Sequence, residues 1–166
     1  MQIRRAALGS AVFLVIAPGT VAGLIPWLLT GWRTADAPTS WLPAQALGVV
    51  VLVVAVVVLL SAFTRFVVEG FGTPAPIAPP DRLVVGGLYR HVRNPMYVAV
   101  LGAIAGQALL FGQLVLLGYA ALVAAAFVTM VRLHEEPALR RSFGDQYVAY
   151  RQAVPGWIPR LTPWRP

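Results

Sequence analysis

Cysteine and lysine are both absent from this chain of 166 residues. The lack of cysteine excludes disulfide bonds and thiolate metal ligands, and the lack of lysine excludes Schiff-base chemistry on a lysine amine. All 13 basic residues are therefore arginine, against six acidic residues, and the net charge is +7. Such an excess of positive charge is typical of nucleic-acid binding. The positions of the arginines, given below, indicate a membrane instead, and no nucleic-acid partner is expected.

Charge of either sign is scarce in this sequence. Only 11% of the residues are charged and 58% are hydrophobic, whereas a soluble domain has about 25% charged residues. A water-soluble fold of this length could not bury so much apolar surface, so lipid must be the solvent for much of it. The length suits one domain, residues 1–166. We therefore predict a single-domain, multi-pass protein of the cell membrane.

Three long uncharged runs locate the spans: Ala6–Thr30, Trp41–Thr64 and Asn94–Val131. A spanning helix needs about 20 apolar residues, so the third run holds two helices, with the turn at Phe111-Gly112-Gln113. The predicted fold is all-α, with four transmembrane helices of which the last two form a hairpin. The helices are placed at 6–30, 42–64, 95–111 and 114–133, with a cytoplasmic loop at 71–94 and a cytoplasmic, amphipathic helical segment at 134–166.

A cleaved signal peptide is the alternative for the first run, because "MQIRR" precedes it. The apolar run continues well past the usual core of about 7–15 residues, and Val21-Ala22-Gly23 inside it is a poor cleavage site. We therefore favour a membrane span.

The arginines divide unevenly between the two sides of this topology. Twelve of the 13 fall on one side, and Arg33 alone lies on the other. The positive-inside rule makes the arginine-rich side cytoplasmic, which places both termini in the cytoplasm. Trp27, Trp32 and Trp41 stand where helix ends meet the outer interface, as in an aromatic belt.

A dense polar cluster, "GLYRHVRNPMYVAV", begins the third uncharged run. Asn94 suits the N-cap of a helix and Pro95 its first turn. The free N–H groups and the positive end of the helix dipole would favour an anionic group there. The alternatives are plain ones: Arg90 as a topology signal or lipid contact, Tyr97 as a belt residue and His91 as a surface histidine.

A second polar cluster covers 132–160. Glu135 and Glu136 are adjacent, and adjacent helical residues do not share a face. We therefore expect one carboxylate to face a site and the other to pair with an arginine. Pro137 is expected to start a new helix and Gly144 to break it. After the break, Tyr147, Tyr150 and Arg151 form a stripe.

Two other interpretations of this second cluster are an interfacial helix and a metal site. The stripe also suits an amphipathic interfacial helix with snorkelling arginines and with aromatic rings at the lipid headgroups. A metal site at His134-Glu135-Glu136 is disfavoured, because contiguous ligands on a helix point in different directions, and no metal is expected.

Gln107 is the one polar residue in the middle of the third predicted helix. A buried amide in a membrane helix needs a partner. It therefore either makes hydrogen bonds between helices or forms a wall of a cofactor pocket.

The two clusters together resemble the isoprenylcysteine carboxyl methyltransferase family, which is related to the phospholipid N-methyltransferases. The resemblance covers roughly half of the chain, residues 81–160. The family histidine falls at Asn94, and its second glycine at Ala99. Gly106-Gln107 is similar to a glycine–glutamine element of the family. The other matching positions are Gly87, Tyr89, Arg93, Pro95, Tyr97, Glu135, Glu136, Phe143, Gly144, Tyr147, Tyr150, Val154 and Pro155.

The resemblance implies a membrane methyltransferase that uses S-adenosylmethionine and acts on a lipophilic or lipidated acceptor, with membrane lipids around it. It implies that Arg93 or Asn94 holds the cofactor carboxylate, that one of the two glutamates holds its ammonium or ribose, and that Arg132 or Arg151 holds an acidic acceptor. The implied catalytic residues are Arg93, Glu136 and Arg132. The implied cofactor-binding residues are Gly87, Tyr89, Asn94, Pro95, Tyr97, Gln107, Glu135, Glu136, Tyr147, Tyr150 and Arg151.

Two alternatives to an active methyltransferase remain open at this stage. One is a non-catalytic scaffold that binds lipid through its arginine-rich face. The other is a membrane reductase that uses NADPH, for which the loops are short. The sequence does not fix the methyl acceptor, with a carboxylate favoured, nor the oligomeric state.

Overall fold

A computed structural model describes residues 12, 15–35, 39–70 and 82–165. The described residues contain helices and no strand, which confirms the prediction of an all-α fold. Parts of three predicted segments lie outside the described residues, namely 6–11 and 13–14 of the first helix, 71–81 of the loop and residue 166 of the C-terminal segment.

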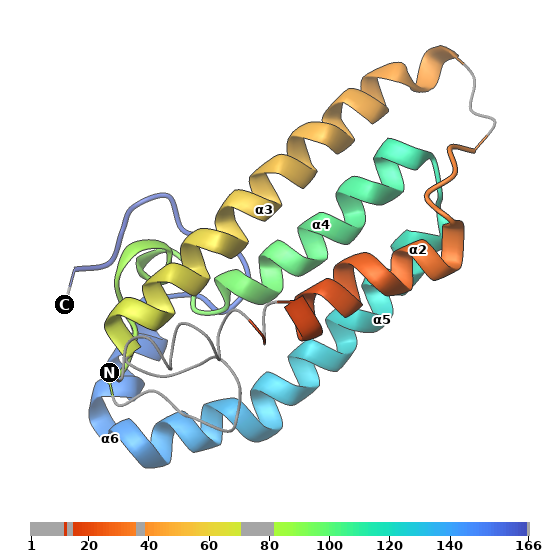
Figure 1. The fold of residues 1–166 in the computed structure, drawn as a ribbon. Coiled ribbons are helices and arrows are strands. Elements are labelled where there is room, and N and C mark those ends of the chain that lie inside the picture. The colour runs from red at the N-terminus through yellow and green to blue at the C-terminus, as the bar shows by residue number, and fades with distance from the viewer. Residues whose placement is uncertain (1–11, 13–14, 36–38, 71–81, 166) are drawn as a thin grey trace.

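The long axes of α2, α3, α4 and α5 alternate in direction along the chain (Figure 1). Among the described residues, two helices are long and apolar enough to cross a membrane, Thr39–Phe66 and Val115–Ala153, and two shorter apolar helices are Val15–Thr30 and Pro95–Phe111. The elements in chain order are η1 (Thr20–Leu24), α2 (Ile25–Thr30), η2 (Thr39–Trp41), α3 (Leu42–Gly70), η3 (Gly87–Arg90), α4 (Pro95–Phe111), α5 (Val115–Met130), η4 (Val131–Glu135) and α6 (Glu136–Ala153).

Helix α4 begins and ends where the sequence predicted. Pro95 occupies its first turn, and Gly112 follows it with φ 66° and ψ 21°, a left-handed conformation that favours glycine. The turn of the hairpin is therefore confirmed. Helix α3, by contrast, runs to Gly70, six residues beyond the predicted end at 64. Arg65 and Glu69 form an i,i+4 ion pair on this added length, which supports a helix that continues past the apolar run.

A π turn carries α5 into α6 without interruption. In η4 the N–H of Glu136 donates to the carbonyl of Val131, five residues earlier. Pro137 falls in the first turn of α6, as predicted, because a missing N–H is tolerated there. The helix is not separate, however, since Val115–Ala153 is one continuous helical run. The chain breaks at Gly144, as predicted, with φ 52° and ψ −128°.

Helix α4 lies at the centre of the bundle, between α3 on one side and α2 with α5 on the other (Figure 1). On its face toward α5, Val100, Ile104 and Ala108 form a buried core with Leu116 and Val123 of α5. Its face toward α3 carries Gly106, which lies against Gly48 with almost no space between the two backbones. The end of α3, η3, the start of α4 and α6 all gather at one end of the bundle. The candidate site is found there.

Gln107 is 5% exposed and joins two helices and a loop through hydrogen bonds. Pro26 has no N–H, so the carbonyl of Ala22 loses its usual helical donor. The Gln107 amide nitrogen donates to that carbonyl at 2.7 Å, and the amide oxygen accepts from the Trp32 indole at 3.1 Å. Tyr119 donates to the neighbouring carbonyl of Val21 at 2.9 Å. Gln107 thus satisfies a carbonyl that a proline leaves free, as an apolar surrounding requires.

Replacing Gln107 with leucine is expected to destabilise the bundle by about 1–3 kcal/mol, because the Ala22 carbonyl and the Trp32 indole both lose their partner. Thermal unfolding of the purified protein in detergent, followed by circular dichroism, measures this. The matched control is Gln113→Leu, since the Gln113 amide donates to the carbonyl of Arg33 at an exposed position. Equal midpoints for the two variants would contradict the structural role of Gln107.

Candidate functional site

Seven polar side chains from three separate segments meet at the end of the bundle where α4 begins. They come from the start of α4 and the loop before it, from the π turn and from α6. We call this group the polar cluster: Arg93, Asn94, Tyr97, Glu135, Glu136, Tyr147 and Arg151.

The Arg93 guanidinium is the centre of the polar cluster. Its Nη1 donates to Glu136 Oε1 at 2.7 Å and to the Tyr147 hydroxyl at 3.1 Å, and its Nε donates to the Val154 carbonyl at 3.0 Å. The side chains of Arg93 and Glu136 are each only 13% exposed. Charge-assisted hydrogen bonds of this kind are stronger than neutral ones. One arginine thus ties the start of α4 to both halves of α6 and to the tail.

The two adjacent carboxylates have different partners. The second oxygen of Glu136 pairs with Arg151 Nη2 at 3.2 Å, and this arginine is 53% exposed. Glu135 accepts a hydrogen bond from the Tyr97 hydroxyl. Glu135 lies beyond the apolar part of its helix, and burial raises the pKa of its carboxyl while the bond from Tyr97 acts to lower it. The π turn ends at this pair, and such turns are frequent at functional sites.

Asn94 occupies the N-cap position of α4, as predicted, but its side chain makes no capping hydrogen bond. Its Nδ2 donates to the Gly156 carbonyl at 3.1 Å instead. The reason is the C-terminal tail, which lies along the loop before α4. The N–H groups of Arg93 and Asn94 donate to the carbonyls of Pro155 and Gly156 at 2.9 and 3.3 Å. The tail thereby binds the Asn94 side-chain amide, which makes no capping hydrogen bond to the first turn of α4.

The second half of α6 packs against protein. Tyr147, Tyr150 and Val154 form a buried core, and the Tyr150 hydroxyl donates to the Tyr89 carbonyl at 2.7 Å. These two α6 tyrosines therefore do not lie at the lipid headgroups, as the amphipathic-helix alternative required. Tyr89 is buried too, and burial raises the pKa of its hydroxyl. The described residues offer that hydroxyl no hydrogen-bond partner.

Two aromatic residues beside the polar cluster were not predicted. The ring of Tyr97 lies 4.5 Å from that of Phe127 and 6.3 Å from that of Trp157, measured between centroids. Phe127 gives no signal in the sequence, because it stands inside a long apolar run. Trp157 stands two residues after the Val154-Pro155 pair, so its closeness to a recognisable motif was the one available clue.

Three predicted site residues, Gln107, Gly87 and Arg132, lie apart from the polar cluster. Gln107 lies 12 residues, or about 18 Å, along α4 from Pro95. Gly87 lies in η3 against the side chain of Arg65. Arg132 is exposed, and no described residue forms an ion pair or hydrogen bond with it. His91, which was expected to be a bystander, holds the tail: its Nδ1–H donates to the Arg160 carbonyl at 2.8 Å, since a carbonyl can only accept.

Comparison with known proteins finds a family match over much of the chain. The model of the family described as "Phospholipid methyltransferase" matches residues 43–146, which is more than half of the chain. The protein-S-isoprenylcysteine O-methyltransferase of Schizosaccharomyces pombe (strain 972 / ATCC 24843) is 38% identical over 79 residues, 48% of this chain and 34% of the relative. The matched part therefore spans about a third of the length of that curated relative.

Proposed function

Because the chain belongs to the phospholipid methyltransferase family, and is thus an enzyme by family, we propose that it transfers a methyl group from S-adenosylmethionine to a lipophilic acceptor in the membrane. The name of the Schizosaccharomyces pombe relative specifies an isoprenylcysteine and an oxygen atom as the methylated group. Carried over to this chain, it makes an oxygen acceptor, and first of all a carboxylate, the favoured one.

The observation that carries the proposal is the polar cluster itself, which retains binding capacity for a zwitterionic ligand. A Cβ added to Gly156 would lie 3.2 Å from Arg93 Nη2 and 3.6 Å from Asn94 Nδ2. Two donors thus border a space that glycine leaves open, which suits the carboxylate of the cofactor. The second oxygen of Glu135 suits its ammonium or ribose, and the buried Tyr89 hydroxyl offers one more hydrogen bond.

S-adenosylmethionine supplies a methyl group on a sulfonium: the acceptor forms a bond to the methyl carbon as the carbon–sulfur bond breaks, and that electron pair stays on sulfur. The chain has to align the reacting atoms and exclude water. The rings of Tyr97, Phe127 and Trp157 suit both tasks, since aromatic faces also attract a cation. A carboxylate acceptor needs no general base, and the exposed Arg132 and Arg151 are available to hold its charge.

The proposed topology follows from where the polar groups lie. All four apolar helices cross the membrane in this proposal, and the end with the polar cluster faces the cytoplasm, together with both termini. The twelve arginines that the positive-inside rule assigns to one side support this orientation. The cofactor would then bind from the cytoplasm, and the acceptor would arrive through the bilayer.

Substituting Glu136 with glutamine tests the cofactor site. Glutamine keeps the shape of the side chain but removes the charge that holds Arg93 and Arg151. We expect S-adenosylhomocysteine to bind at least about tenfold more weakly, because a hydrogen bond to a charged group contributes about 1.5–3 kcal/mol. Isothermal titration calorimetry of the purified protein measures this affinity.

Asp145→Asn is the matched control, since Asp145 is an exposed acid on the same helix. It should bind S-adenosylhomocysteine as the unmodified protein does. Unchanged affinity in Glu136→Gln would remove Glu136 from the cofactor site. Failure of the unmodified protein to bind S-adenosylhomocysteine would favour the non-catalytic scaffold.

A further inference from the structure

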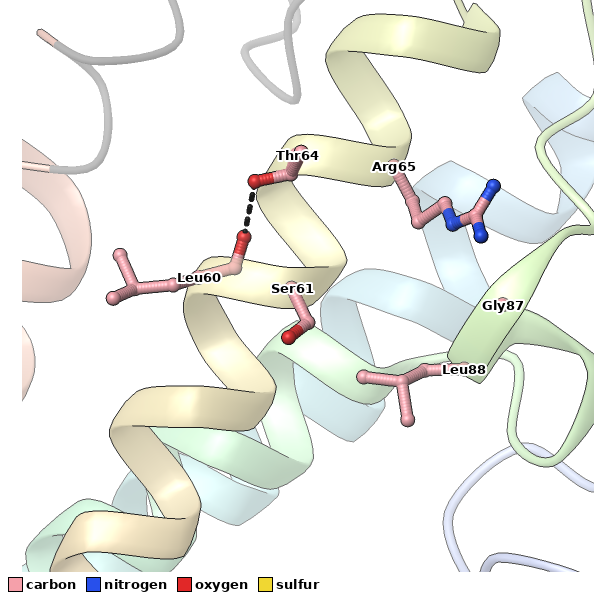
Figure 2. Close-up of a pocket in the computed structure, with 6 residues that line it drawn as sticks. All are labelled: Leu60, Ser61, Thr64, Arg65, Gly87 and Leu88. Carbon is pink, nitrogen blue, oxygen red and sulfur yellow. Dashed lines mark hydrogen bonds between the residues drawn. The ribbon is translucent and has the colours of Figure 1, made fainter.

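A surface groove of about 450 Å³ lies between the end of α3 and η3, apart from the polar cluster (Figure 2). Leu88, which lines the groove, packs against a buried cluster that contains Ala62 and Tyr89. Figure 2 shows the Arg65 guanidinium extending toward Gly87, with Leu88 reaching from η3 toward Ser61. The groove is lined by Leu60, Ser61, Thr64, Arg65, Gly87 and Leu88.

The groove has unused hydrogen-bond donors at one end. Arg65 is 52% exposed, and only its Nη1 is paired, with Glu69 Oε1 at 2.9 Å. Its Nε and Nη2, and the Ser61 hydroxyl, have no hydrogen-bond partner among the described residues. The guanidinium lies close over Gly87, where a Cβ would lie 2.9 Å from Nε. A guanidinium with free N–H groups suits the oxygens of a phosphate, and the Ser61 hydroxyl is a further free donor in the same groove.

The other end of the groove continues into an exposed apolar stripe. Val53, Val57 and Leu60 are spaced four and three residues apart, so they share one face of α3. All three are exposed. Arg65 is the first charged residue after the uncharged run 41–64, which is the depth at which lipid headgroups meet a spanning helix. The apolar stripe and the free donors are therefore arranged in the same order along α3 as the acyl chain and the headgroup of a lipid.

We propose that this groove binds one anionic phospholipid, with its phosphate on Arg65 and Ser61 and an acyl chain along Val53, Val57 and Leu60. The lipid connects α3 to η3. Glu69 already joins these elements, since its Oε2 accepts from the Gly86 N–H at 3.0 Å while its Oε1 holds Arg65. The proposal concerns a bound lipid outside the polar cluster and does not depend on methyl transfer.

Native mass spectrometry of the delipidated full-length protein in detergent tests the proposal. The probes are phosphatidylglycerol, phosphatidylcholine with the same acyl chains, and glycerol 3-phosphate. We expect one phosphatidylglycerol to bind at least about tenfold more tightly than phosphatidylcholine, as a hydrogen-bonded charge pair allows. Glycerol 3-phosphate should not compete. Equal affinity for the two lipids would overturn the proposal, and binding of glycerol 3-phosphate as tightly as the lipid would replace it with a free-anion site.

Two variants and one control locate the bound lipid. Ser61→Leu fills the groove without altering the Arg65–Glu69 pair, and it should weaken phosphatidylglycerol binding about tenfold with an unchanged thermal midpoint. Arg65→Gln should abolish the preference over phosphatidylcholine. Arg140→Gln removes an exposed arginine of α6 and should bind lipid like the unmodified protein. This groove would be excluded as the site if Ser61→Leu bound phosphatidylglycerol like the unmodified protein. It would also be excluded if Arg140→Gln weakened lipid binding as much as Arg65→Gln.

Discussion

Replacing Arg93 with glutamine is expected to lower methyl transfer roughly 100-fold or more. The guanidinium holds Glu136, Tyr147 and the Val154 carbonyl together, and its side chain is largely buried. Removing one partner of a buried ion pair costs about 3–5 kcal/mol, since the other charge stays buried alone. The same change removes a donor for the proposed cofactor carboxylate. Both S-adenosylhomocysteine affinity and transfer of a radioactive methyl group should therefore fall.

Arg151→Gln is the matched control for this experiment. It removes the other arginine of Glu136, but this pair is half exposed and longer, at 3.2 Å. Exposed pairs contribute about 0–1 kcal/mol, so the affinity of this variant for S-adenosylhomocysteine should fall by less than about fivefold. The central role of Arg93 would be contradicted by two variants with the same loss of affinity. It would also be contradicted by an Arg93→Gln protein that binds S-adenosylhomocysteine normally.

Adding a methyl group at Gly48 or Gly106 is expected to disrupt the bundle. A Cβ at Gly48 would lie 2.6 Å from the Leu110 nitrogen, and one at Gly106 would lie 2.9 Å from the Leu52 nitrogen. These obstacles are backbone atoms, so α3 and α4 would have to move apart along their length. Overpacking of this kind costs about 1–3 kcal/mol. We expect Gly48→Ala and Gly106→Ala to lower the unfolding midpoint in detergent by roughly 3–10 °C.

Gly102→Ala provides the control on the same interface. Its Cβ would meet only the Ala55 side chain at 3.4 Å, an ordinary van der Waals contact. Alanine is favoured over glycine inside a helix by about 1 kcal/mol, so this variant should be unchanged or slightly more stable. If all three substitutions shifted the midpoint alike, close backbone contact would not be what sets the α3–α4 distance.

The helices were predictable where a local rule decides them. Proline in the first turn and glycine after the last fixed the bounds of α4, because both act through their own backbone. The same rule placed Pro137 in the first turn of α6, but it did not predict that α6 continues from α5. There the sequence gives no sign that η4 adopts a wider π turn, in which a five-residue hydrogen bond keeps the helix continuous. A helix end is set by the residues at that end, whereas a π turn depends on which neighbouring groups satisfy its backbone hydrogen bonds.

The residues of the polar cluster came from motif resemblance, but their contacts did not. Adjacency predicted that the two glutamates have different partners, yet nothing in the sequence pairs Glu136 with Arg93, 43 residues away. The sequence of the tail likewise did not predict that the Gly156 carbonyl would accept a hydrogen bond from the Asn94 amide, or that Trp157 would lie beside Tyr97. Such contacts are long-range, and they form only once the loop and tail run side by side.

What the sequence by itself determined is therefore the apolar character and the family of this protein: long apolar runs that predict helices, arginines that the predicted topology places on one side, and two motifs of a methyltransferase family. These follow from composition and spacing, which require no knowledge of packing. The tertiary structure alone decided which carboxylate meets which arginine, why Gln107 satisfies the carbonyl that Pro26 frees, and where Arg65 faces a groove. The physical reason is that hydrogen bonds and close backbone contacts depend on distances between segments remote in the chain, and folding sets those distances.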